Sequence, residues 1–68
     1  MYRVTRTLPT GEQKEREFAK IREVGQHVAF CLHDNTGMDK KQATQCGMEA
    51  ERTGRVEAAG YTFVVVKF

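Results

Sequence analysis

The feature that most limits how this chain can fold is its last segment, GYTFVVVKF at residues 60–68. β-Branched and aromatic residues fill this segment, so we predict a strand. Side chains of a strand alternate between two faces. Both faces are apolar here, with Tyr61, Phe63 and Val65 on one and Val64, Val66 and Phe68 on the other. Such a strand needs cover on two sides, and a short chain can supply few covering elements.

The chain has 68 residues, which is enough for one domain spanning residues 1–68. A domain of this size buries only about 60% of the surface that its unfolded chain exposes, so its stability is marginal. Cys31 and Cys46 occur without a secretory signal, and we therefore predict reduced thiols in a cytoplasmic protein. The longest apolar run is far too short to cross a membrane. We expect close packing or self-association to supply the missing stability.

The first residues, Tyr2 to Leu8, alternate in polarity and predict a second strand. A turn follows at Pro9 to Gly11. Residues 12–23 can then form either a helix, for which they have high propensity, or the returning strand of a hairpin.

In the hairpin, the turn creates the pairs Tyr2–Phe18, Arg3–Glu17 and Arg6–Lys14. The first two pairs are favourable, whereas the third sets like charges side by side. We favour the hairpin because a lone first strand would be an exposed edge, and the helix then begins near Ile21.

Two helices are predicted in the middle of the chain. The first buries the stripe from Val24 to Leu32 and ends at the sequence DNTG, residues 34–37. Asp39 and Gln42 predict a capping box for the second, which runs from about Lys40 to Thr53. Its inner face has only small residues, Ala43, Cys46, Gly47 and Ala50, so the helices can lie close together.

These elements predict an α+β fold with the order ββααβ. A small antiparallel or mixed sheet of three strands carries a two-helix hairpin on one face.

Cysteine and histidine residues raise the question of a metal site or a nucleophile. His27 and Cys31 lie one helical turn apart, yet no C-x-x-C or H-x-x-x-H pair occurs. A catalytic cysteine must be exposed beside a base, whereas Cys31 falls on the inner helical face. Asp34 and Asp39 are explained by a helix end and a helix start rather than by a calcium loop. We expect no metal, no cofactor, no small-molecule substrate and no enzymatic activity.

Two apolar features lack cover in this arrangement. The helices shield one face of the last strand, which leaves Val64, Val66 and Phe68 open, and such a patch usually marks an interface. Phe30 falls opposite the apolar stripe of its helix, beside His27. We interpret the three strand residues as a contact for a second copy or a protein partner, and Phe30 with His27 as a separate contact. The alternatives are long side chains folded over the strand, and packing of Phe30 beneath the loop after the second helix.

Charge leaves a second function class open. The net charge of +2 comes from 11 basic and 9 acidic residues with interleaved signs, whereas nucleic-acid binders usually gather their basic residues. The alternative function is therefore a nucleic-acid-binding regulator that uses Lys40, Lys41, Arg52 and Arg55, or the exposed arginines of the hairpin. The first two open a helix, where cations oppose the macrodipole, and phosphate contact would offset that cost.

Three segments carry a resemblance to known proteins: REFA at 16–19, LHDNTG at 32–37 and GYTFVV at 60–65. With the order of elements, they resemble small uncharacterised proteins of actinobacterial phages and mobile elements. The resemblance implies a protein that binds and modulates a host or phage macromolecule. Together with the open strand face, it predicts a small protein-binding or regulatory module that acts as a homodimer or on a host protein.

Overall fold

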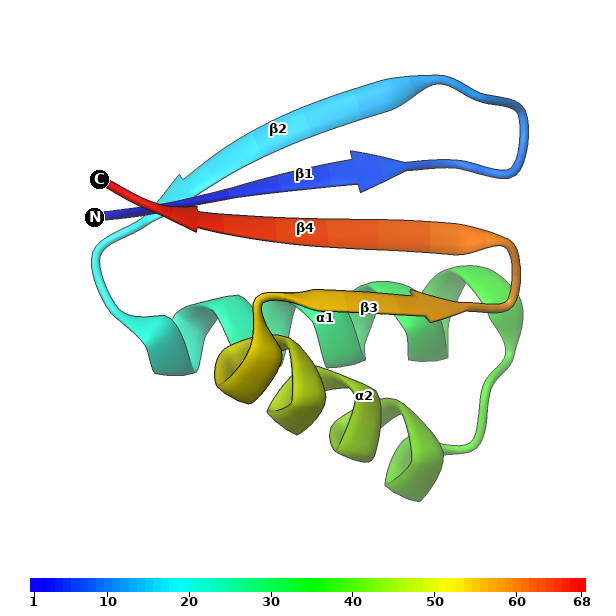
Figure 1. Cartoon of the computed structure of the whole chain (residues 1–68). Helices are drawn as coiled ribbons and strands as arrows, with labels where there is room; N and C mark the ends of the chain where they lie inside the picture. Colours follow the sequence, from blue (N-terminus) through cyan, green and yellow to red (C-terminus); the bar gives the residue numbers. More distant parts are fainter.

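The computed structural model describes all 68 residues and arranges them in two layers, a sheet and a pair of helices (Figure 1). The elements are β1 (Tyr2–Thr7), β2 (Gln13–Phe18), α1 (Ile21–Thr36), α2 (Lys40–Thr53), β3 (Arg55–Ala58) and β4 (Tyr61–Lys67). The strand order is β2-β1-β4-β3, and every neighbouring pair is antiparallel. Both helices lie on one side of the sheet, and the chain ends lie together at one end of it. The α+β class and the helical layer on one face are confirmed.

Residues 13–18 are a strand, so the hairpin prediction is confirmed. β1 and β2 pair in the expected register, with Tyr2 opposite Phe18 and Arg6 opposite Lys14. Two backbone bonds close the turn between them: the Leu8 N–H donates to Glu12 O at 2.8 Å, and the Gly11 N–H donates to Leu8 O at 2.9 Å.

The sheet has a fourth strand, β3, and the prediction of three strands in the order ββααβ is therefore wrong in this detail. The stretch after α2, expected as a loop, pairs with β4 and places Val56 opposite Phe63. Ala59 and Gly60 make the connection with φ values of 52° and 84°. Positive φ at both positions of a two-residue loop is the geometry that matches the twist of a hairpin. β4 thus becomes a central strand.

The helix boundaries follow local signals. At the start of α1, the Lys20 N–H donates to the Glu23 carboxylate at 3.0 Å. Each helix ends at a glycine in the left-handed conformation, Gly37 with φ 72° and Gly54 with φ 80°. Asp39 caps α2 as predicted and accepts from the Lys41 N–H at 3.2 Å, but Gln42 makes no bond back to Asp39, so the predicted capping box is wrong in this half. Neither helix combines the length and apolar character needed to cross a membrane.

The core lies between the sheet and the helices. Its largest fully buried side chains come from both layers: Phe63, Leu32, Val4, Val24 and Val28. The small residues of α2 allow the close approach that the sequence predicts, because Gly47 lies directly against the Gly25 backbone of α1. Any side chain at position 47 would therefore meet main-chain atoms.

Candidate functional site

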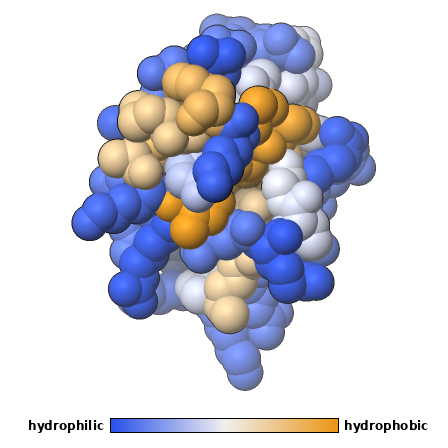
Figure 2. Space-filling model, turned by 60° about the vertical axis from the view of Figure 1, so that its left-hand side comes forward, coloured by the Kyte–Doolittle hydropathy of each residue, from blue (hydrophilic) through white to orange (hydrophobic).

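The face of the sheet that points away from the helices is open and has an apolar centre. Phe63 is fully buried towards the helices, so alternation places Val64 and Val66 on this outer face, with Phe68 extending the row. Val66 is 49% exposed and Phe68 is 56% exposed, while Val64 is half-buried. We call these three residues the outer apolar row. Figure 2 brings the end of the molecule with both termini forward and shows hydrophobic patches separated by hydrophilic side chains.

Charged side chains border the outer apolar row. Arg3 is ion-paired with Glu17 at 3.3 Å, and its guanidinium carbon lies 4.8 Å from the centroid of the Phe68 ring. Arg55 and Glu57 pair at 2.6 Å on β3. Arg3 thus partly covers Phe68, as the alternative interpretation expects for a long side chain. No such contact covers Val66, so β4 keeps exposed apolar surface on this side.

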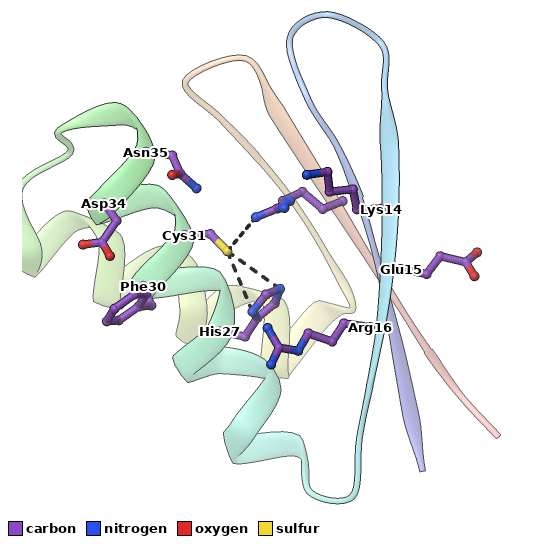
Figure 3. Close-up of a pocket in the computed structure, with 9 residues that line it drawn as sticks. Lys14, Glu15, Arg16, His27, Phe30, Cys31, Asp34 and Asn35 are labelled. Carbon is purple, nitrogen blue, oxygen red and sulfur yellow. Dashed lines mark hydrogen bonds between the residues drawn. The ribbon is translucent and has the colours of Figure 1, made fainter.

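A second feature lies on the helical side of the sheet, where a cavity of about 390 Å³ separates β2 from α1 (Figure 3). The basic and the acidic side chains of β2 lie on opposite faces of the strand. Lys14 and Arg16 are paired with Arg6 and the buried Val4, so they lie on the helix-facing side. Figure 3 shows Lys14 and Arg16 on that side, whereas Glu15 points away from the cavity. Arg6 adds a third cation from β1.

The opposite wall of the cavity is one face of α1. His27, Phe30, Cys31 and Asp34 line it at a spacing that brings residues onto one side of a helix. Phe30 is 67% exposed at this wall, so the predicted exposed aromatic is confirmed and does not pack beneath β3. The two residues expected to form a separate contact, Phe30 and His27, therefore belong to one cavity.

Arg6 links the two walls. Its Nη1 donates to Cys31 Sγ at 3.0 Å, and the same sulfur lies 3.8 Å from each ring nitrogen of His27. The Nε of Arg6 is buried and has no hydrogen-bond partner. A buried donor without a partner is uncommon in folded proteins and needs an explanation.

The electrostatics of the cavity are those of gathered cations. Burial lowers the pKa of His27 below its ordinary value of 6.5, and the charges of Arg16 and Arg6 lower it further. The ring also packs on Phe18, with centroids 5.1 Å apart. His27 is therefore neutral at pH 7, and the fixed positive charge comes from the three basic side chains.

Neither cysteine is well placed for nucleophilic chemistry. Cys31 is only 7% exposed, so its sulfur is poorly placed to attack a substrate. The other thiol, Cys46, has its pKa raised by burial and by Glu49, which keeps it protonated and less reactive. No three His, Cys, Asp or Glu side chains gather closely enough to hold a metal ion.

The four cations suggested for nucleic-acid contact do not share a surface. Lys40 and Lys41 open α2, whereas Arg52 and Arg55 lie at its other end, and a helix of 14 residues is about 21 Å long. Arg55 is also engaged with Glu57. The cations that do converge are Arg6, Lys14 and Arg16. The sequence analysis named the hairpin arginines as a group but did not select Lys14, and the like-charged pair Arg6–Lys14 was the one sign that these cations lie together.

No protein-family model, no curated protein and no solved structure matches this chain.

Proposed function

We propose that this protein is a small, non-enzymatic binding module that associates with a second copy of itself through the outer face of the sheet. One observation carries the proposal: β4 is apolar on both sides, and the helices cover only one of them. Since β4 is a central strand, the outer apolar row lies in the middle of that face. An uncovered apolar centre with a polar border is the usual anatomy of an interface.

The charges around the row favour a second copy as the occupant. Two such faces can pack about a two-fold axis that runs along the strands, which lays β2 of one copy over β3 of the other. Glu15 then faces Arg55 of the partner copy at each border, β4 of one copy lies over β1 of the other, and the two apolar rows lie side by side at the centre. The face is therefore complementary to itself.

Pairing through the sheet edge is disfavoured for the same strand. When two β2 strands pair antiparallel about a two-fold axis, residues of the same face meet. Glu15 would meet Glu15 or Glu17, and Lys14 or Arg16 would meet another cation. Such like-charge contacts protect an edge from self-pairing, so association is directed to the face.

The proposal also covers the cellular location and the origin of the protein. The two free thiols support a reducing, cytoplasmic environment. The resemblance to phage and mobile-element proteins supports such an origin, and a regulatory role in which the dimer presents its remaining surfaces to a host protein. The nucleic-acid alternative has less support, because its four cations are divided between the two ends of α2.

Sedimentation equilibrium on the wild type, Val64→Lys and Met48→Lys tests the proposal. Met48 is 62% exposed on α2, so its variant adds the same charge in place of an apolar side chain outside the outer face. The interface is small, and we expect a weak dimer that forms as the concentration rises towards about 1 mM.

The average mass of the wild type and of Met48→Lys should rise with concentration, while Val64→Lys should stay monomeric. A wild type that is monomeric at every concentration, or a Val64→Lys variant that associates as the wild type does, would refute self-association through this face.

A further inference from the structure

The cavity between β2 and α1 gathers positive charge without neutralising it. Arg6, Lys14 and Arg16 line it, and neither of the two ion pairs in the structure involves any of them. Two acidic residues also line the cavity, but Glu15 points away from it and Asp34 makes no ion pair. The cavity therefore has three cations against the one carboxylate of Asp34, which is an excess of positive charge.

This arrangement is costly for the fold. Arg6 and Lys14 are direct cross-strand neighbours on the same face, where like charges destabilise a sheet. The Nε of Arg6 is buried without an acceptor, and a buried donor left unpaired costs about 1–3 kcal/mol. Places where a sequence breaks local rules without compensation inside the fold tend to be functional sites. An anion in the cavity would offset the like-charge repulsion between Arg6 and Lys14.

The cations suit a phosphate group. A guanidinium offers a planar fork of N–H donors that matches phosphate oxygens, and a lysine ammonium adds a point charge. Arg16 and Lys14 come from one wall, and Arg6 lies between the walls through its bond to Cys31. A phosphate between them would receive charge-assisted hydrogen bonds from more than one side.

The cavity also has room and surface for what the phosphate is attached to. Its volume of about 390 Å³ falls within the range of small-molecule sites, roughly 300–1,000 Å³. Phe30 lies at the margin of the same cavity, on the side of α1 away from Lys14 and Arg16, and presents an exposed ring on which a planar group can stack (Figure 3). Cations with one exposed aromatic ring indicate an aromatic ligand that carries phosphate.

We propose that the cavity between β2 and α1 binds a nucleoside monophosphate, with the phosphate held by Arg6, Lys14 and Arg16 and the base stacked on Phe30. This site lies on the helical side of the sheet, apart from the outer face, and its occupancy does not require the dimer. It revises the expectation that the protein has no small-molecule ligand.

Titration followed by amide NMR, in a low-salt buffer without phosphate, tests the proposal with four probes: AMP, inorganic phosphate, adenosine and a short single-stranded oligonucleotide. AMP should shift the amides of residues 14–16 and 27–31 and bind more tightly than inorganic phosphate. Adenosine should bind at least about tenfold more weakly than AMP, because one charge-assisted hydrogen bond contributes about 1.5–3 kcal/mol.

Variants locate the site. The double variant Lys14→Gln/Arg16→Gln should weaken AMP binding by about tenfold or more, and Phe30→Ala should weaken AMP but not inorganic phosphate. Arg6 is left intact because it contacts Cys31 in the core. The control Lys41→Gln/Arg52→Gln removes one lysine and one arginine, as the double variant does, from exposed positions of α2 that do not line the cavity, and it should leave the affinity unchanged.

Three results would overturn the proposal. One is the absence of shifts at the cavity with both AMP and inorganic phosphate. Another is equal weakening by the control variant, which would indicate attraction to net charge alone. The third is an oligonucleotide that binds through the cavity more tightly than AMP at matched phosphate concentration, which would assign the site to single-stranded nucleic acid instead.

Discussion

The contact between the helices allows a sharp test, because the same substitution at its two glycines has opposite expected results. A Cβ added at Gly47 would overlap the carbonyl oxygen of Gly25 and lie 3.1 Å from its carbonyl carbon. A Cβ added at Gly25 would instead meet the end of the Glu51 side chain, with the carboxyl carbon at 2.6 Å. Backbone cannot move aside without separating the helices, whereas a glutamate side chain can rotate away.

The magnitudes follow from two opposing effects. Replacing glycine by alanine inside a helix contributes about 1 kcal/mol of stability through propensity. Overpacking against a rigid neighbour costs about 1–3 kcal/mol, and contact with main-chain atoms places Gly47→Ala at the upper end. We therefore expect Gly47→Ala to lower the free energy of unfolding by about 2 kcal/mol, which corresponds to a fall in Tm of roughly 10 °C. Gly25→Ala should be neutral or stabilising by up to about 1 kcal/mol.

Urea denaturation followed by circular dichroism, with the m value checked for each variant, measures this difference. The two variants are matched in residue type, helical state and burial. Equal changes in stability for both, or a Gly47→Ala variant as stable as the wild type, would refute the reasoning that the helices meet through bare backbone at this point.

Two further predictions concern the turn and the cavity. Ala59→Asn should stabilise the protein by about 0.5–1 kcal/mol, because Ala59 has a φ of 52° in a hairpin turn that favours Asn before Gly; thermal unfolding checks this, and an unchanged or lower Tm would contradict it. The second prediction concerns His27, whose pKa is lower in the folded protein than its ordinary value of 6.5, so the unfolded chain binds more protons just below that pH. Stability should therefore fall as the pH drops below 6.5 towards the lowered pKa of the folded state, and His27→Gln should reduce this slope; a wild type that gains stability over this interval would show the sign to be wrong.

The sequence predicted the structure correctly where a local pattern is compatible with only one backbone conformation. The turn at Pro9 to Gly11 and the alternation of β1 together predicted the register of the first hairpin, down to the pair Arg6–Lys14. The segments DNTG and Asp39 marked the boundary between the helices because such residues either tolerate the left-handed conformation or cap a helix. Small residues on α2 predicted its close contact with α1.

Other features depend on tertiary contacts that no local pattern reveals. β3 contains a single β-branched residue, Val56, and its turn uses Ala-Gly rather than a typical Asn-Gly pair, so its pairing with β4 dominates a weak propensity. The cavity depends on where α1 lies relative to β2, because residues of both elements line it. The sequence showed that Arg6 and Lys14 form an unfavourable like-charged pair. The position of α1 was needed to show that both side chains line a cavity.

The central claim is that two copies pack through their outer sheet faces, with their outer apolar rows side by side. Isotope-filtered NOE measurements on an equimolar mixture of labelled and unlabelled protein, at about 1 mM, test this contact directly. We predict intermolecular NOEs from the methyl groups of Val64 and Val66 to outer-face side chains of the second copy. Intermolecular NOEs confined to the helical side, or none at this concentration, would contradict the claim.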